Sequence, residues 1–551
     1  MAPDVVTNLT TNFMENLPAK SSSAPGFSYD ETPYPSSSFP ESHPDKLCAM
    51  GRLFGINATP PTTARILELG CADGANLLPM AQHAPTASFL GIDASSKNVA
   101  TANETILAAG LRNVEIRHMD LVQFPSSEGK FDYIIAHGLF SWVDETVRLK
   151  ILSICRDHLS ENGVAYISYN ALPGWSMRLG LREMMLFHTS QFTDGKTKVA
   201  QARALTAFLA DSVPAEGNPY GMLLKHELQR MASQPDGYIR HDVLGETNEP
   251  MYFHQFVQLA MDAGLQYVSE PTLDQMLTSN FPEKVSQTLQ QITNNIIAKE
   301  QYMDFLRNRS FRRTLLCHRE AQLDRNITPN SIKSFYYTSI IAAPETKPID
   351  LKSGVNVGFR LRTGGDVAIN VDNSFLKAAF SILAECGLNR ISFSELLSGA
   401  REKSTNSSEW SDRPDREELE ETSLATNLLS LYTRGLVDIY ADRPSFRTTV
   451  PERPFVTPLV RHQATHARVV TNLAHVAVPV DLIGRYVLAA CDGQRDQKAL
   501  VEHLMALSKE GKLQVGENEA PVSDETRMRA IFTDQVARLI PQIVALGFVR
   551  P

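Results

Sequence analysis

A short turn near residue 70 has the composition of a loop that approaches a ligand. An apolar stretch that contains Glu68 is followed by Gly70 and Gly74, and a helical stretch comes directly after them. Glycines at such positions let the backbone turn sharply and come close to a ligand without a Cβ in the way. The helix behind the turn points its first N–H groups into the same crevice. A lone Gly-x-x-x-Gly pair is nevertheless a weak signal.

Two aspartates downstream strengthen this signal. Asp93 ends the next apolar run, SFLGID, and Asp120 ends the one after it, in HMDL. Carboxylates at the ends of neighbouring parallel strands meet at one edge of a sheet. There Asp93 can accept hydrogen bonds from two ribose hydroxyls, and Asp120 can meet an adenine amino group. Together with the turn, they predict a nucleoside pocket.

The turn also discriminates between two nucleoside cofactors. Nicotinamide dinucleotides typically use G-x-G-x-x-G, in which backbone amides hold a pyrophosphate. Here the glycines are four positions apart, and Asp73 places an acid inside the turn. An acid suits a ligand with positive charge, such as S-adenosylmethionine with its ammonium and sulfonium groups, so Glu68 and Asp73 are expected near its amino-acid end. A nicotinamide-dependent oxidoreductase is a disfavoured alternative.

A second set of residues follows the fourth and fifth predicted strands, where a second substrate would lie. His137 could take up a proton or orient the acceptor, since an ordinary histidine pKa lies in the useful range, or it could only bond its own loop. Asn170 could bind an amine or shape a turn. Tyr169, Trp142 and Trp175 could line an aromatic tunnel for a cation, although tryptophans are more often packing residues.

Four motifs carry a resemblance to a known family. The chain resembles class I S-adenosylmethionine-dependent methyltransferases in ELGCADGANLLPMA, GIDAS, HMDL and FDYIIAHGLFSWV. Three further segments narrow this resemblance: the N-terminal arm, the segment YNALPGW, and HDVLGETNEPMYFHQFVQLAMDAGLQYVSEP. They are similar to bacterial methyltransferases with a methyltransferase regulatory domain, of which the rickettsial-type protein-lysine methyltransferases that act on outer-membrane proteins are the known examples.

The resemblance implies S-adenosylmethionine as cofactor, S-adenosylhomocysteine as product, and a protein with accessible lysines as partner. It implies cofactor contacts for residues of the arm, the turn and the strand ends, namely Tyr29, Tyr34, Ser36, Glu68, Gly70, Cys71, Ala72, Asp73, Gly74, Asp93, Ala94, Asp120, Leu121 and His137. Candidate catalytic residues are His137, Trp142, Tyr169, Asn170 and Trp175. No metal is expected, because methyl transfer from a sulfonium needs alignment rather than a Lewis acid, and the sequence has no HExxH or Cys/His cluster.

The elements that must position these residues alternate between strand and helix. Helical segments separate five apolar runs, RILELG, SFLGID, VEIRHMD, FDYIIAHG and VAYISY. Short continuous apolar runs predict strands covered on both faces, and their alternation with helices predicts a doubly wound, Rossmann-like α/β core. Its turn carries Ala72 where many class I enzymes have glycine, so we expect a negative φ at this position.

Four further regions surround the core, which is expected at residues 45–180. Residues 1–44 are a Ser- and Pro-rich arm whose aromatic side chains could dock on another surface, although a loose tail is the alternative. Residues 181–345 read as a helical, regulatory domain, with a strand at LQYVSEP and helix through FRRTLL. Residues 346–455 read as a winged-helix-like α+β domain that starts with a hairpin around Gly364 and Gly365, and residues 456–551 as a weaker second copy.

Composition limits the class of protein. The chain of 551 residues is long enough for roughly three or four domains. Its net charge of −9 argues against general affinity for nucleic acid. The six cysteines form no CxxC pair, and we find neither a signal peptide nor an apolar run of about 18 residues, so we expect a cytoplasmic protein without membrane insertion. Homo-oligomer formation is possible.

Two other functions stay open beside protein-lysine methylation. One keeps the methyltransferase fold but changes the acceptor to a small molecule or natural product, although the extent of accessory structure favours a large acceptor. The other is a winged-helix DNA-binding regulator with a ligand-sensing domain. Residues 353–551 carry 23 basic and 25 acidic residues, which disfavours a DNA reader because such proteins usually have a basic excess.

Overall fold

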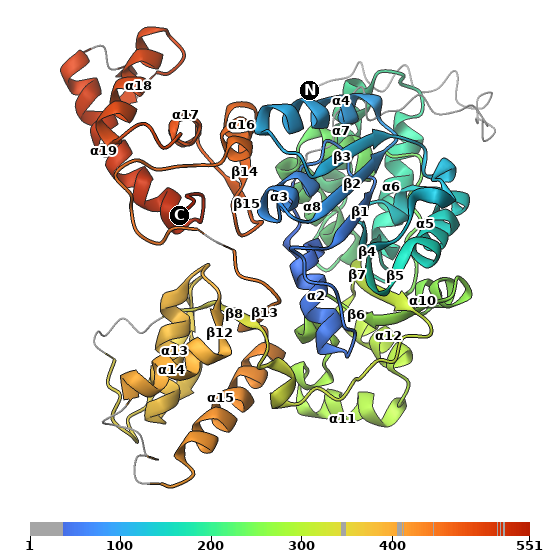
Figure 1. Ribbon diagram of the computed structural model, residues 1–551. Helices are drawn as coiled ribbons and strands as arrows, with labels where there is room; N and C mark the ends of the chain where they lie inside the picture. The colour runs from blue at the N-terminus through green and yellow to red at the C-terminus, as the bar shows by residue number, and fades with distance from the viewer. Residues whose placement is uncertain are drawn as a thin grey trace.

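A seven-stranded sheet forms the centre of the N-terminal half (Figure 1). The structure, a computed structural model, describes residues 37–342, 349–404, 410, 413–444, 446–514, 516–517, 520–521 and 524–551. The strand order is β3-β2-β1-β4-β5-β7-β6. The strands are β1 (Arg65–Leu69), β2 (Ser88–Asp93), β3 (Val114–His118), β4 (Phe131–Ala136), β5 (Leu159–Asn170), β6 (Leu265–Ser269) and β7 (Phe311–His318). The first five pair in parallel, which confirms the five predicted strands and the Rossmann-like core.

Two strands from beyond residue 180 complete this sheet. β6 confirms the strand predicted at LQYVSEP, but the predicted helix through FRRTLL is wrong, because these residues form β7. β7 runs antiparallel between β5 and β6 and pairs with β5 from Phe311 to Leu316. Local sequence does not reveal this strand, since its conformation depends on pairing with β5, which is far away in the sequence. The sheet therefore extends into the region that we expected to be helical.

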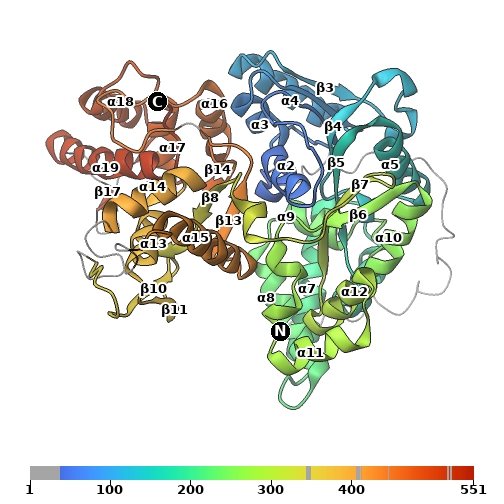
Figure 2. The same cartoon turned by 60° about the horizontal axis from the view of Figure 1, so that its bottom comes forward.

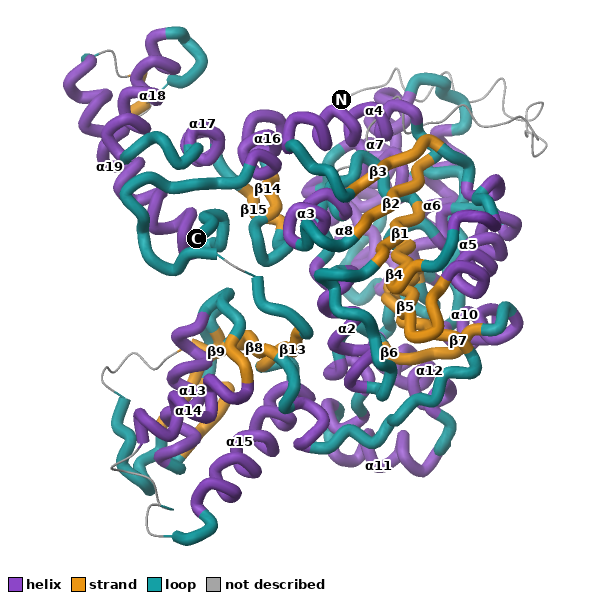
Figure 3. The backbone as a smooth tube through the Cα atoms, in the orientation of Figure 1, coloured by secondary structure: helices purple, strands orange, loops and turns teal. Residues whose placement is uncertain are grey.

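Helices cover both faces of the sheet, as Figures 1 and 3 show. They are α2 (Pro44–Leu53), α3 (Leu77–His83), α4 (Ser96–Ala109), α5 (Glu145–His158), α10 (Phe253–Asp262) and α12 (Ile296–Arg307). Local signals in the sequence mark both ends of α4. The Ser95 side chain accepts a hydrogen bond from the Asn98 N–H at the start of α4, and Gly110 ends that helix with a φ of 65°.

Helices α6 (Ser176–Thr189), α7 (Gly195–Ser212), α8 (Pro219–Ser233) and α9 (Asp236–Tyr238) lie between β5 and α10 in the chain. They lie in, or just before, the region predicted to be mostly helical. They bury a hydrophobic cluster of their own, which includes Leu181, Met185, Leu224 and Met231. A further helix, α11 (Glu283–Ile292), precedes α12. This region combines a helical subdomain with strands of the main sheet.

The first C-terminal module contains β8 (Tyr336–Ser339), β9 (Ile341–Ala342), β10 (Val357–Leu361), β11 (Val367–Val371), α13 (Ser374–Cys386), β12 (Ile391–Ser392), α14 (Phe393–Ser404), α15 (Arg416–Thr433) and β13 (Val437–Tyr440). β10 and β11 confirm the predicted hairpin, with Gly364 and Gly365 at positive φ in its turn. β8 lies between β12 and β13, so this fold begins before residue 346. Its buried residues continue the hydrophobic core of the main sheet.

The last module has a separate hydrophobic core. It contains α16 (Pro458–His466), β14 (Val469–Thr471), β15 (Ala477–Pro479), α17 (Leu482–Ala490), α18 (Gln497–Lys509), β16 (Gly516–Glu517), β17 (Ala520–Pro521) and α19 (Glu525–Ala545). Figure 2 shows both C-terminal modules on the same side of the core. α16 packs against α3 and α4. Within the described ranges, the helices include none that combines the length and apolar character needed to cross a membrane.

Candidate functional site

The predicted turn lies where the strand order reverses, at the carboxyl ends of β1 and β4. This is the position at which open α/β sheets bind their ligands. The N–H groups of Gly70 and Cys71 donate to the Ile92 carbonyl of β2, at 2.8 and 3.1 Å. Gly74 has a φ of 77°, and a Cβ there would lie 2.8 Å from Ile116 Cδ1. Its backbone conformation and this close contact both require glycine.

Ala72 contradicts the expectation of a negative φ, because its φ is +48°. Its N–H donates to Asp93 Oδ2 at 2.8 Å, and this bond helps to hold the strained conformation. The left-handed region costs a residue with a Cβ about 1 kcal/mol or more. Such strain persists where surrounding contacts impose it, often at functional sites.

We expect Ala72→Gly to raise stability against urea by about 0.5–1 kcal/mol, because glycine adopts a positive φ without a Cβ clash. Ala75→Gly is the matched control in the same loop. Ala75 does not have a positive φ, so that glycine should only add disorder to the unfolded chain and lower stability. Equal losses in both variants, measured by tryptophan fluorescence in urea, would contradict the strain at Ala72.

Two carboxylates face the turn from β1 and β2. Glu68 is 3% exposed; its Oε1 accepts a 2.6 Å hydrogen bond from Asn76 Nδ2, and its Oε2 has no partner among the described residues. Burial, together with the nearby Asp93, raises the pKa of Glu68 to about 8, although the bond from Asn76 lowers it. Asp93 Oδ1 accepts from the Ser95 N–H at 2.9 Å, and burial raises its pKa. This pair of acids suits a ligand that carries hydroxyls and positive charge.

Two further residues of the turn have local roles in the structure. The Asp73 carboxylate accepts from the Ala75 N–H at 3.2 Å and is half-buried. Cys71 is buried, and burial raises the pKa of its thiol well above the usual range. A thiol in this state is a poor nucleophile. The cysteine therefore offers its backbone rather than its sulfur to a ligand.

The end of β3 lies beside the end of β2. Asp120 is exposed, and its Oδ1 accepts from the Val122 N–H at 2.9 Å. It caps a short 3-10 helix, η3 (Leu121–Gln123), whose first residue, Leu121, is buried. The Ala94 carbonyl contacts His118 Nε2 at 3.0 Å. Asp120, Leu121 and Ala94 thus lie along the same sheet edge as the turn.

His137 follows β4 and is enclosed by aromatic rings. Its Nδ1 lies 2.8 Å from the Tyr166 hydroxyl, and its ring stacks on Phe39 with 3.6 Å between the centroids. The Phe311 ring lies edge-on at 6.1 Å. Burial and the positive charge of Arg313 lower the pKa of His137 to about 3. The expectation of a pKa in the useful range is therefore wrong, because a neutral histidine of this kind takes up a proton poorly at neutral pH.

The two tryptophans near β4 and β5 meet edge to face. Trp142 ends the 3-10 helix η5 (Phe140–Trp142), and its ring lies 6.2 Å from that of Trp175, which precedes α6. The guanidinium of Arg178 lies 5.6 Å from the Trp175 ring centroid. Trp175 is thus already in contact with one cation of the chain.

Tyr169 and Asn170 are consecutive in β5 and point to opposite sides of the sheet. Tyr169 is buried, stacks on Phe256 at 4.1 Å, and has its hydroxyl 3.3 Å from Thr314 Oγ1. The Asn170 side chain donates to Asn248 Oδ1 at 2.9 Å. The structure therefore brings Asn170 toward the loop before α10, while Tyr169 packs in the core.

Sequence reasoning missed several residues of this site. Asn76 precedes α3, where asparagine normally caps a helix, but its side chain makes no capping bond and turns to Glu68 instead. Ser42 and Phe39, from the end of the arm, also contact Asn76 or His137. Its position just before a helix was the only local sequence feature that could have drawn attention to Asn76. The predicted arm contacts Tyr29, Tyr34 and Ser36 lie outside the described residues.

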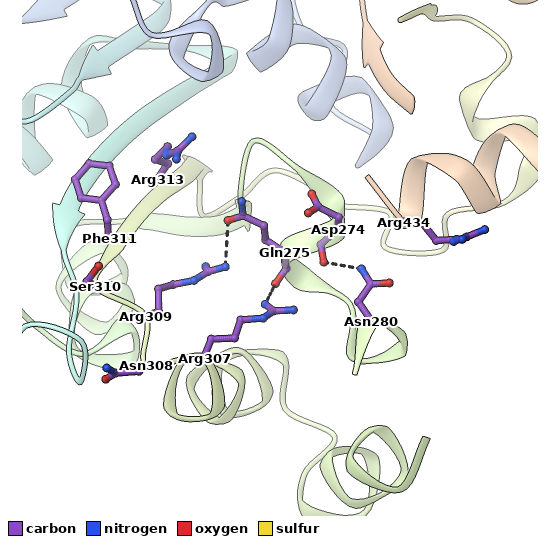
Figure 4. A pocket seen from close by; sticks show the side chains of 10 residues that line it. All are labelled: Asp274, Gln275, Asn280, Arg307, Asn308, Arg309, Ser310, Phe311, Arg313 and Arg434. Atoms are coloured by element: carbon purple, nitrogen blue, oxygen red, sulfur yellow. Dashed lines mark hydrogen bonds between the residues drawn. The ribbon is translucent and has the colours of Figure 1, made fainter. Parts of the chain in front are cut away.

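An arginine-lined cleft of about 760 Å³ opens beside Phe311. Figure 4 shows the side chains that line it. The Phe311 ring lines the cleft and also touches His137. The lining of the cleft includes one acid, Asp274, and four arginines, Arg307, Arg309, Arg313 and Arg434. Among the described residues, neither Arg307 nor Arg434 forms a salt bridge. The cleft is therefore suited to a partner with negative charge.

Three family models match this chain. A model described as a methyltransferase domain matches residues 66–163, which run from β1 through the turn to the beginning of β5. A predicted methyltransferase regulatory domain matches residues 235–318. The C-terminal winged helix domain of PKMT matches residues 452–548, which coincide with the last module. This match confirms the winged-helix prediction for that module.

Full-length relatives agree with these matches. An uncharacterized protein of Rickettsia prowazekii (strain Madrid E) is 36% identical over 520 residues, which cover 93% of this chain and 92% of the relative. PKMT2 from Rickettsia typhi, solved in complex with AdoHcy, matches with a TM-score of 0.82 at 32% identity, over 94% of this chain and 100% of that chain. A second protein of Rickettsia prowazekii is 41% identical over 233 residues, 42% of this chain and 93% of the relative.

Proposed function

Because the chain belongs to the family of S-adenosylmethionine-dependent methyltransferases that includes PKMT2 of Rickettsia typhi, we propose that it methylates lysine side chains of a protein. The similarity to PKMT2 over the whole of that chain carries the proposal. The resemblance of the sequence to rickettsial-type protein-lysine methyltransferases points to the same acceptor. By the same resemblance, an outer-membrane or other surface protein is the acceptor.

The residues of the turn fit this cofactor. S-adenosylmethionine supplies a methyl group on a sulfonium, which transfers by in-line displacement. Glu68 has a buried carboxylate oxygen that has no partner within the described part of the chain, and this oxygen would accept a hydrogen bond from the cofactor's ammonium group. Asp93 would accept the ribose hydroxyls, since each of its oxygens keeps a second lone pair beside its backbone bond. The glycine turn would let the backbone approach the cofactor, and Asp120 would contact the adenine amino group.

The acceptor side of the site would deliver a neutral amine. A lysine has an ordinary pKa of about 10.4 and arrives charged, so it must release a proton to solvent before its nitrogen attacks. Aromatic surroundings disfavour the charged form once water is excluded. Trp142 and Trp175 would line the approach, and Asn170 would orient the amine through its side-chain oxygen. His137, neutral in this environment, would orient the acceptor rather than take its proton.

The arginine-lined cleft supports a large acceptor over a small one. It connects to the site through Phe311. Arg309 and Arg313 already pair with acids of the chain, so Arg307 and Arg434, which form no salt bridge among the described residues, could hold acidic side chains near a target lysine. A small molecule or natural product, the second candidate acceptor, needs no such platform. The DNA-binding alternative has no support in the family matches, and the winged helix resembles that of PKMT.

A methyl-transfer assay with tritiated S-adenosylmethionine and bacterial extract tests the proposal. We expect label in protein bands, and mass spectrometry should locate it on lysine as methyllysine. The control is the same reaction with added S-adenosylhomocysteine, which should suppress labelling by competing for the turn. Label confined to small molecules would refute the protein acceptor and leave the methyltransferase assignment intact.

A further inference from the structure

A chain of hydrogen bonds links the last module to the buried acid of the cofactor turn. His475 lies in the hairpin between β14 and β15 and is 5% exposed. Its Nε2 lies 3.0 Å from Asn76 Oδ1, and the two residues are 399 positions apart in the sequence. The opposite end of the same amide, Nδ2, donates to Glu68 Oε1 at 2.6 Å. Asn76 thus lies between His475 and Glu68.

The neighbours of Asn76 determine which way its amide points. The Phe39 backbone N–H can only donate, and it lies 2.9 Å from Oδ1. Oδ1 is therefore the acceptor end, and Nδ2 faces the Glu68 carboxylate. His475 must then carry its proton on Nε2 in order to donate to Oδ1. Burial lowers the pKa of His475 to about 3, which keeps the ring neutral, and its Nδ1 has no partner among the described residues.

The hairpin holds His475 in a strained backbone conformation. Its φ is +62°, which is unfavourable for a residue with a Cβ. The Asn472 side chain stabilises this turn by accepting from the N–H groups of Ala474 and Val476, at 3.0 and 2.8 Å. Strain of this kind persists where the surrounding structure imposes it. Here the surrounding contacts aim the imidazole at Asn76.

Separate contacts dock the hairpin and its module on the core. Thr471 Oγ1 donates to Ser38 Oγ at 3.2 Å, next to the segment that reaches Phe39. At the chain end, Arg550 Nη2 donates to the Gln82 carbonyl of α3 at 3.0 Å. These bonds place the hairpin over the start of α3, where Asn76 lies.

We infer that His475 is a positioning residue for the cofactor pocket, acting through Asn76 on Glu68. The inference rests on the proposed contact between Glu68 and the cofactor ammonium. By donating to Oδ1, His475 helps to keep Nδ2 directed at Glu68, and that bond favours the ionised carboxylate. The last module thereby completes the pocket from outside the methyltransferase domain, so its docking and cofactor affinity are coupled.

Other ionisable groups surround both ends of this chain of bonds. Glu68 faces Asp93 of β2, Cys71 of the turn and Tyr166 of β5. His475 faces His43 at the start of α2, with 4.9 Å between ring centroids, and His83 of α3. Burial also lowers the pKa of His43, so this ring stays neutral beside His475.

Calorimetric titration with S-adenosylhomocysteine over a range of pH tests the inference. In the unmodified chain, affinity should rise with pH as Glu68 ionises and plateau above its pKa of about 8. His475→Ala should weaken binding roughly three- to tenfold at neutral pH, through one lost hydrogen bond, and move the midpoint of this rise to higher pH. His475→Gln has an amide that can donate in place of Nε2. It should restore much of the affinity and return the midpoint toward that of the unmodified chain.

Two control variants separate the possible outcomes. Val476→Ala changes an exposed neighbour on the same hairpin and should bind like the unmodified chain. Glu68→Gln should weaken binding and abolish the rise with pH. If His475→Ala does not fold, His475→Leu fills the site without a donor and takes its place.

The inference is overturned if the His475 variants bind normally, or if they bind weakly with an unmoved midpoint and no rescue by glutamine. In the second case the histidine only packs. If Glu68→Gln binds S-adenosylhomocysteine weakly while the His475 variants bind it normally, the inference fails but the proposed pocket is supported. Normal binding by Glu68→Gln would instead refute the proposed role of Glu68 and the inference with it.

Discussion

Replacing Arg312 by Met should destabilise the core by about 3–5 kcal/mol, because it removes the central cation from three buried carboxylates and leaves only the more distant Arg309 among the described cations that pair with them. Arg312 has no exposed side-chain surface and lies in β7. It donates to Asp304 through Nε and Nη2, both at 2.8 Å, to Glu270 at 2.9 Å and to Glu300 at 3.0 Å. Glu300 and Asp304 belong to α12, and Glu270 follows β6. One guanidinium thus joins β7 to two neighbouring elements.

Urea unfolding followed by tryptophan fluorescence measures this loss. The matched control is Arg313→Met, the next residue, whose side chain is 31% exposed and pairs with Glu41. A partly exposed pair of this kind contributes about 1 kcal/mol or less. Comparable losses in the two variants would contradict the central role of Arg312.

The loss in Arg312→Met should also depend on pH. Burial raises the pKa values of Glu300 and Asp304 in the folded chain, and removal of Arg312 takes away a charge that opposes this rise. With folded pKa values above the unfolded ones, the native state binds more protons, so stability falls as pH rises through that interval. The variant should therefore lose less stability in mildly acidic buffer than at neutral pH, and a loss independent of pH would contradict this account.

Asp93→Ala should weaken the binding of S-adenosylhomocysteine by about 100-fold or more, equivalent to ~3 kcal/mol, since a carboxylate contributes about 1.5–3 kcal/mol per hydrogen bond. Asp93 also accepts the N–H groups of Ala72 and Ser95, at 2.8 and 2.9 Å. Its loss would thus loosen the turn as well as remove the proposed ribose contact. Calorimetry measures this affinity. The affinity of Asp93→Asn, which keeps one acceptor oxygen, should lie between that of the unmodified chain and that of Asp93→Ala.

A ligand variant separates these two effects of Asp93. An S-adenosylhomocysteine analogue without ribose hydroxyls cannot bond to the Asp93 carboxylate. Asp93→Ala should therefore reduce the affinity for this analogue much less than the affinity for S-adenosylhomocysteine. Equal losses for both ligands would assign Asp93 to the shape of the turn alone. Unchanged affinity of Asp93→Ala for S-adenosylhomocysteine would show that the pocket lies elsewhere.

Local pattern was informative wherever a residue's environment follows from its neighbours in the chain. The five apolar runs became the parallel strands, and the acids at their ends came to one edge, because strand direction and connection are regular in such sheets. Gly74 was identified by its place in the turn. Ala72 shows the limit, since its positive φ depends on the bond to Asp93 as well as on its own residue type.

The sequence by itself therefore determined the Rossmann-like core, the acids and glycines of the turn, and a family resemblance that the full-length match to PKMT2 confirms. Tertiary structure alone decided β7 and the carboxylates gathered around Arg312, the low pKa of His137, and the reach of His475 to Asn76. The physical reason is the distance along the chain over which each kind of interaction acts. Strand and turn preferences act over a few residues, whereas burial, charge pairing and side-chain orientation depend on groups that only the folded chain brings together.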